Sequence, residues 1–255
     1  MPAAPQLSAY AIPGIPLIQA GDDIVDIMLE KARAAGIALQ GGDVLVVSSK
    51  IVSKAAGRLV CLDTVRPSSA AADLAVETDK DPRLVELILS ESEHVSRKRR
   101  GVLVTKHRLG FVSANAGIDQ SNIEGGDERA LLLPINPDQA ASAIREEIQA
   151  RLGLQVGVII SDTHGRPFRV GNIGVAIGVA GLPASKDLRG SRDLYGRILE
   201  ITQVAYADLV ASAAHLLCGE ADEGLPAVLL RGLDVGGEPG CAADLIRAPE
   251  HDLYR

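Results

Sequence analysis

The chain has 255 residues, 47% hydrophobic and 23% charged, which predicts a folded protein with a sizeable core and excludes disorder as its main state. A formal net charge of −7, with two Phe, four Tyr and no Trp, argues against a surface that binds nucleic acid. The longest apolar run, 173–184, is too short to cross a membrane, and the N-terminus lacks a basic signal-peptide region. Three cysteines without a CxxC pair indicate neither a disulfide framework nor a zinc site, so we expect a cytoplasmic protein without membrane partners.

Helical and strand patterns alternate along the chain. In chain order, the predicted elements are a helix over 22–36, a strand over 44–47, a helix over 81–101, paired strands over 101–105 and 111–114, a helix over 137–152, a strand over 156–160, a glycine-rich stretch over 171–181, a helix over 203–217 and a strand over 227–230. This alternation predicts a mixed α/β fold, treated as a single module over 1–255 that would divide into two lobes near 133–138. The basic run 97–100 falls at the end of a predicted helix, where cations meet the helix dipole, and we prefer this interpretation to a phosphate site.

The common nucleotide-binding motifs are absent. Neither a P-loop nor a G-x-G-x-x-G fingerprint occurs, so a Rossmann-type fold is not expected. Polar side chains nevertheless gather just past the ends of predicted strands, which is the edge where α/β proteins bind ligands. Lys50 and Lys54 follow the strand 44–47, and if this segment is helical they share a face that can bind phosphate. A solvent-exposed first turn is an equally good interpretation of these two lysines.

Three carboxylates occupy comparable positions in separate segments. Asp162 follows the strand 156–160, Asp119 lies after the strand 111–114, and Glu220 lies in a glycine-flanked acidic loop. Taken alone, the segment at Asp162 is equally well explained as a turn. The one at Asp119 would alternatively be a hydrogen-bonded surface loop, and the one at Glu220 alone would be a hydrated turn. Together they supply the oxygen ligands that two Mg²⁺ or Mn²⁺ ions on a phosphate chain require, whereas the turn interpretation must treat all three as coincidence.

These segments together resemble the coenzyme F420-0:γ-glutamyl ligase family. The resemblance runs in order along nearly the whole chain, through 15–18 with 21–23, 49–55, 115–122, 161–169, 174–178, 192–197 and 219–222. It implies a family-specific mixed α/β fold and a homodimeric, GTP-dependent ligase with two divalent metal ions, aided by K⁺. Some bacterial members carry a flavin-reductase-like domain downstream, which we do not expect in a chain that ends at Arg255.

The resemblance also implies roles for individual residues. The implied metal ligands are Asp119 and Asp162 for one ion, and Thr163 and Glu220 for the second. The implied contacts to GTP are Pro16, Leu17, Ile18, Gln19, Ser49, Lys50, Lys54, Asn122 and a loop over 218–225 that includes Gly219, Ala221 and Asp222. Asp162 is the expected catalytic centre, with positive charge supplied by Lys54 and by Arg166 or Arg169. Two positions depart from the family pattern, because His164 and Phe168 stand where other members usually have an aromatic residue and a tryptophan.

The activity implied by the resemblance is addition of L-glutamate to the F420-0 precursor, followed by further γ-linked glutamates. A carboxylate of the precursor would form an acyl phosphate from GTP, and the glutamate amine would then displace phosphate. The residues alone support only a metal-dependent enzyme acting on a phosphorylated small molecule. A metal-dependent phosphohydrolase and a non-catalytic nucleotide-binding protein are therefore retained as alternatives.

Overall fold

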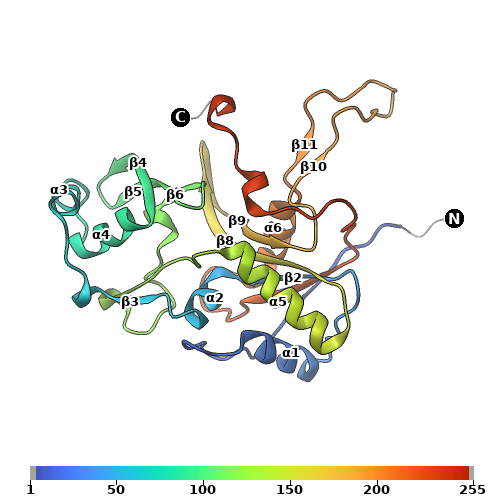
Figure 1. The fold of residues 1–255 in the computed structure, drawn as a ribbon, viewed down its shortest axis with the longest axis horizontal. Coiled ribbons are helices and arrows are strands. Elements are labelled where there is room, and N and C mark those ends of the chain that lie inside the picture. The colour runs from blue at the N-terminus through green and yellow to red at the C-terminus, as the bar shows by residue number, and fades with distance from the viewer. Residues whose placement is uncertain (1–3, 253–255) are drawn as a thin grey trace.

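A five-stranded mixed sheet lies at the centre of the molecule in the computed structural model, which describes residues 4–252 (Figure 1). Its strands, in spatial order, are β1 (Ser8–Ala11), β12 (Ala227–Arg231), β2 (Val44–Ser48), β8 (Gly157–Arg166) and β9 (Arg169–Ala180). Only β2 and β8 pair in parallel, and the remaining neighbours are antiparallel. The predicted α/β class is therefore confirmed, with a mixed rather than a doubly wound parallel sheet.

Both faces of the sheet are buried, which explains why its central strands are apolar without alternation. Leu45 and Val47 point into the core that contains helices α1 (Ile24–Ala34) and α5 (Pro137–Leu152). The alternate residues of β2 point into a second core, against helix α6 (Tyr206–Cys218). Because successive side chains of a strand face opposite sides, a strand covered on both faces needs a continuous apolar run.

The predicted helix over 81–101 is wrong in its second half. Helix α4 (Pro82–Ser90) begins at the predicted Asp81 cap, but the chain then forms strand β4 (Ser92–Arg99). The turn at Gly101, where φ is +82°, reverses the chain so that β4 pairs with β5 (Val102–His107). This tertiary pairing overrides the helical spacing, and the basic run therefore lies on a strand and its turn instead of at a helix end.

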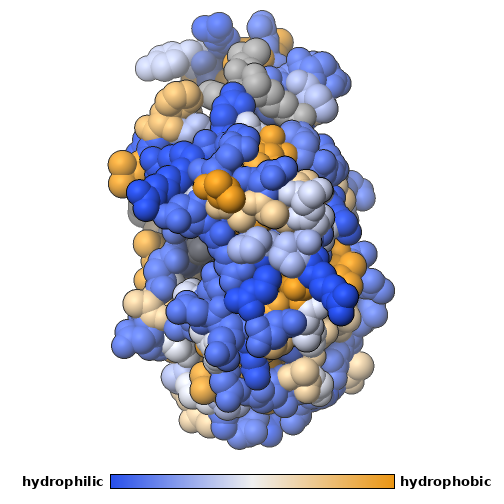
Figure 2. All heavy atoms as spheres, turned by 90° about the vertical axis from the view of Figure 1, so that its left-hand side faces the viewer, coloured by the Kyte–Doolittle hydropathy of each residue, from blue (hydrophilic) through white to orange (hydrophobic). Residues whose placement is uncertain are grey.

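The predicted hairpin that follows is confirmed, because β5 pairs antiparallel with β6 (Val112–Ala114). These strands belong to a group of elements with its own buried core, which includes Leu62, Val85 and Leu103. The other elements between α1 and α5 are α2 (Ser49–Ala55), β3 (Leu59–Cys61), α3 (Ser69–Thr78) and β7 (Arg129–Leu131). The surface at this end of the molecule is mostly hydrophilic, with scattered apolar side chains (Figure 2).

The strand predicted over 156–160 continues further than expected. Strand β8 runs to Arg166 and forms a long hairpin with β9, so Asp162 and Thr163 lie on a strand and not in a turn. The glycine-rich stretch is the partner strand. A Cβ atom at Gly174 would lie 2.7 Å from the carbonyl oxygen of Ala211, so glycine lets α6 pack closely there.

The remaining elements are short. Strands β10 (Lys186–Asp187) and β11 (Gln203–Val204) pair at the base of a protruding arm that spans 188–202 (Figure 1). The 3-10 helices are η1 (Leu62–Thr64), η2 (Asn115–Gly117), η3 (Gly126–Glu128), η4 (Ala242–Leu245) and η5 (Pro249–His251). Among the described residues, no helix is both long and apolar enough to cross a membrane.

Candidate active site

A pocket of about 380 Å³ opens beside the ends of β2 and β12. Its lining comes from five separate segments of the chain, namely 15–18, 48–54, 119–122, 161–163 and 215–226. A cavity of this size falls within the range of small-molecule sites, and it brings together polar groups from several loops. It is therefore the leading candidate for the functional site.

Helix α2 supplies two lysines to one side of the pocket. The side chain of Ser48 accepts a hydrogen bond from the amide of Lys50 at the start of the helix. Because the segment is helical, Lys50 and Lys54 share one face as predicted, and their binding of phosphate stays a prediction. Lys50 Nζ lies 2.7 Å from Asp119 Oδ2, and Lys54 Nζ donates to the carbonyl oxygen of Asn122 at 2.7 Å.

On the side of the pocket next to α2, the surroundings disfavour the charged forms of both Asp119 and Lys54. Burial raises the pKa of the Asp119 carboxyl, and the negative charges of Asp162 and Glu220 raise it further, while Lys50 acts in the opposite direction. Burial lowers the pKa of the Lys54 ammonium, and its neighbour Lys50 lowers it further. Three carboxylates that raise one another's energy make this pocket a favourable place for additional positive charge.

Asp162 projects from β8 with both carboxylate oxygens engaged. Ser49 Oγ donates to Asp162 Oδ1 at 3.3 Å, and His164 Nε2 lies 3.2 Å from Asp162 Oδ2. The ring of Phe111 packs against the His164 imidazole, with 4.7 Å between centroids. The carboxylate is thus held on a strand of the central sheet, and not in the turn that was the alternative interpretation.

Glu220 comes from the loop that follows α6. His215, in the last turn of that helix, places Nε2 2.7 Å from Glu220 Oε1. The loop is also tied to the opposite side of the pocket, because Asn122 Nδ2 donates to the carbonyl oxygen of Ala221 at 2.8 Å. Within the loop, Glu223 Oε2 accepts a hydrogen bond from the amide of Ala221 at 2.9 Å.

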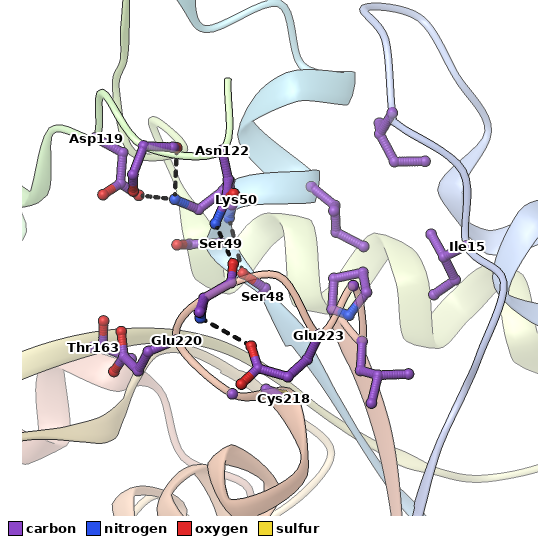
Figure 3. A pocket seen from close by; sticks show the side chains of 18 of the residues that line it. Ile15, Ser48, Ser49, Lys50, Asp119, Asn122, Thr163, Cys218, Glu220 and Glu223 are labelled. Atoms are coloured by element: carbon purple, nitrogen blue, oxygen red, sulfur yellow. Dashed lines mark hydrogen bonds and ion pairs between the residues drawn. The ribbon is translucent and has the colours of Figure 1, made fainter. Parts of the chain in front are cut away.

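Figure 3 shows these groups facing one another across the pocket. Asp119, Lys50 and Asn122 lie on one side. Thr163 and Glu220 lie on the other. The three carboxylates therefore converge on one cavity.

The donor set fits divalent cations that are shared with a ligand. Within residues 4–252, no group of three or more His, Cys, Asp or Glu side chains is arranged to hold an ion by itself. Mg²⁺ is commonly held by one or two carboxylates, with water and substrate phosphates completing its shell. Asp119, Asp162, Thr163 and Glu220 supply only oxygen atoms, as such ions prefer, and they line one pocket.

Comparison with known proteins places the chain in a family. A family model described as F420-0:Gamma-glutamyl ligase matches residues 14–232. The chain belongs to this family. The relatives that the chain matches include three that bear the name coenzyme F420:L-glutamate ligase. The one from Methanothermobacter thermautotrophicus is 47% identical over 98% of this chain and 99% of its own length, and the one from Methanopyrus kandleri is 46% identical over the full length of both. The third, from Haloarcula marismortui, is 43% identical over 98% of this chain and 96% of its own length.

Every pocket segment falls inside the part of the chain that matches the ligase family. Eighteen of the residues expected from the sequence line the pocket: Pro16, Leu17, Ile18, Ser49, Lys50, Lys54, Asp119, Asn122, Asp162, Thr163 and the whole loop 218–225. Three expected residues, Gln19, Arg166 and Arg169, are not part of the lining. The Gln19 amide instead donates to Asp22 in a turn, and Arg166 and Arg169 pair near the end of the β8–β9 hairpin.

The pocket also contains residues that the sequence analysis did not identify. They are Ile15, Ser48, Ile51, Ser121, Ser161, His215 and Pro226. His215 matters most, because it contacts one of the expected metal ligands. The available signal was a single histidine in the last turn of an alanine-rich helix, directly before the acidic loop. Such a histidine is also typical of a simple helix end, where it interacts with the dipole.

Proposed function

We propose that this protein is a GTP-dependent ligase that joins L-glutamate to coenzyme F420-0 and then adds further γ-linked glutamates. The observation that carries the proposal is the convergence of Asp119, Asp162, Glu220 and two lysines in one pocket of a chain from the F420-0:γ-glutamyl ligase family. The pocket suits a triphosphate because two lysines and three carboxylates, which can hold divalent cations, line the same cavity. The names of the relatives support the acceptor and the amino acid.

The proposed chemistry has two steps. A carboxylate oxygen of F420-0 attacks the γ-phosphorus of GTP, forming the acyl phosphate and releasing GDP. The amine of L-glutamate then attacks the acyl carbon, loses a proton, and displaces inorganic phosphate. Both steps move negative charge between oxygen atoms, so positioning and charge stabilisation are the main requirements on the protein.

Individual side chains serve these requirements. Lys50 and Lys54, on one face of α2, neutralise phosphate oxygens. Asp119 and Asp162 would hold one divalent ion, and Thr163 with Glu220 would hold the second. Mg²⁺ or Mn²⁺, when bound there, neutralises charge on the phosphoryl oxygens. Asn122 joins the loop around Ala221 to the opposite side of the pocket, which narrows access for water to the acyl phosphate.

We also propose the K⁺ dependence and the homodimer that the family resemblance implies. Association of two copies is supported by the apolar side chains on the protruding arm. Leu194, Tyr195 and Ile201 are almost fully exposed there. Light scattering of the purified protein measures the mass in solution, and a monomer at micromolar concentration would contradict the dimer.

The test is a reaction of the purified protein with F420-0, L-glutamate, GTP, Mn²⁺ and K⁺, followed by mass spectrometry of the product. The expected result is a product heavier by one or more glutamyl residues, with GTP consumed only when both acceptors are present. Equal GTP hydrolysis without F420-0 and glutamate would instead indicate a phosphohydrolase. Saturable nucleotide binding without any turnover would indicate a binding protein.

A further inference from the structure

Lys50 contacts one of the expected metal ligands. Its Nζ lies 2.7 Å from Asp119 Oδ2 and 3.2 Å from the carbonyl oxygen of Ser121. The ammonium is thus in contact with one of the two carboxylate oxygens of an expected metal ligand. The neighbouring Lys54 differs, because its hydrogen bond goes to the carbonyl oxygen of Asn122 and not to a carboxylate.

The other two carboxylates have partners of a different kind. Asp162 is contacted by the hydroxyl of Ser49 and the imidazole of His164, and Glu220 by the imidazole of His215. Carboxylates that hold metal ions are commonly hydrogen-bonded by such groups, which orient them toward the ion. Among these described contacts, an ammonium held at 2.7 Å is found only on Asp119.

An ammonium and a divalent cation repel each other strongly when both contact one carboxylate. Both are positive, so an ion that enters at Asp119 must displace Lys50 or accept strong repulsion from it. Displacement without a ligand in the pocket leaves Lys50 without a charged partner, with only the Ser121 carbonyl oxygen and water to accept its hydrogen bonds. With a nucleotide in the pocket, the phosphate oxygens offer Lys50 a new charge-assisted hydrogen bond.

We propose that Lys50 is an internal counter-ion for Asp119. A nucleotide phosphate draws Lys50 away from this carboxylate, so a divalent ion binds tightly at Asp119 only together with nucleotide. This inference rests on the proposed function, since it takes the same pocket to hold nucleotide and metal. By thermodynamic reciprocity, the ion must strengthen nucleotide binding by the same factor. The site is thereby kept from holding an ion at Asp119 before the nucleotide arrives.

The test compares Mn²⁺ binding by Lys50→Met, Lys50→Arg and Lys54→Met with that by the intact protein, by electron paramagnetic resonance of free Mn²⁺. Titrations are run without nucleotide and with GDP, so that no turnover is needed. Lys54→Met is the matched control, because it removes the same charge from the same helix face but no contact to a carboxylate. Lys50→Arg is the conservative variant, since it keeps the cation beside Asp119.

Without nucleotide, Lys50→Met is expected to bind Mn²⁺ about 10- to 100-fold more tightly than the intact protein. This factor corresponds to the free energy of the one charge-assisted hydrogen bond that an ion no longer has to break. Lys54→Met is expected to gain much less than Lys50→Met, because Lys54 acts on Asp119 through its charge but makes no hydrogen bond to it. Lys50→Arg should behave like the intact protein. With GDP, the advantage of Lys50→Met should disappear, and its own affinity for GDP should fall.

Two results would overturn the inference. One is an equal or weaker nucleotide-free Mn²⁺ affinity in Lys50→Met, with its circular dichroism unchanged from the intact protein. The other is an equal gain in Lys54→Met, which would indicate a general charge effect. If the intact protein binds no Mn²⁺ even with GDP, the metal part of the proposed function fails together with this inference. If the intact protein does bind Mn²⁺ with GDP, either of the two results above contradicts only the role of Lys50 and leaves the proposed function standing.

Discussion

The two sides of the pocket balance their carboxylates by different means. On the lysine side, defined by Lys50, Lys54 and Asp119, a full positive charge from α2 rests on the carboxylate. On the histidine side, defined by Asp162, His215 and Glu220, the partners are imidazole and hydroxyl groups. From this comparison we infer that the histidine side accepts a cation directly, whereas the lysine side accepts one only in exchange for the ammonium of Lys50. Four predictions test this difference, ordered from the largest expected effect to the smallest.

The largest effect is expected from Asp162→Asn on the histidine side. Loss of a partner of a metal ligand commonly lowers affinity or activity 10- to 100-fold, so loss of the ligand itself should lower ligation by more than about 100-fold. Mass spectrometry of the product and GTP consumption measure this loss. The fold should be retained, because removing one of several neighbouring carboxylates reduces repulsion.

The control for this variant is Asp187→Asn, which removes a carboxylate from the base of the arm, outside the pocket. Ligation should be unchanged in that protein. Retention of more than about a tenth of the activity in Asp162→Asn, well above the loss expected for a ligand, would falsify the assignment of the histidine side.

The next effect concerns the partner of Glu220. His215→Leu removes the group 2.7 Å from Glu220 Oε1 and should weaken Mn²⁺ binding in the presence of GDP about 10- to 100-fold. His215→Gln keeps an N–H donor and should lose less. Calorimetric titration with Mn²⁺ measures both. Equal affinities for the two variants and the intact protein would mean that the contact with Glu220 has no role in metal binding.

A smaller effect, on stability, is expected from loss of the ion pair that fixes the end of α2 behind the lysine side. Arg58 follows α2, donates to the carbonyl oxygen of Leu133 and forms a 2.9 Å ion pair with Glu91, at the end of α4. Burial opposes ionisation of Glu91, but the nearby His107 and Arg58 outweigh it and lower the pKa of this carboxyl. Glu91→Gln should therefore destabilise the fold by about 1–3 kcal/mol at neutral pH, as loss of a charged hydrogen bond does.

The pH dependence of this effect has a definite sign. Because the pKa of Glu91 is lowered in the folded state, this group stabilises the protein at pH values above the ordinary pKa of glutamate. The contribution is lost as the pH falls through the lowered pKa. The stability difference between the intact protein and Glu91→Gln should therefore shrink in acid. Urea denaturation at several pH values measures it, and a difference that is constant with pH would contradict the ion pair.

The smallest effect concerns Cys218, which lines the pocket at the end of α6. Burial raises the pKa of its thiol to about 11, so very little thiolate exists at neutral pH. Alkylation should therefore modify the exposed Cys61 first, as peptide mass spectrometry would record. Rapid labelling of Cys218 at neutral pH would mean that this part of the histidine side opens to solvent.

Sequence reasoning was reliable where the signal is local. Asp81 and Pro82 mark the start of α4, and the two apolar runs that form β2 and β8 need only their own residues to be recognised. It was wrong over β4, because strand pairing with β5 is a contact between residues that the helical spacing does not describe. It also ended β8 too early, since that strand is extended by its partner β9.

The same division holds for the site. The amino-acid sequence by itself determined which oxygen-rich and lysine-bearing segments the chain contains, because those motifs are short and continuous. Only the tertiary structure decided which of them meet. Lys50 and Asp119 are 69 positions apart, and Ser49 and Asp162 are 113 apart, so their contacts depend on how the sheet and its loops are assembled. The partner of each carboxylate is therefore a property of the fold, because no local pattern specifies a contact over such separations.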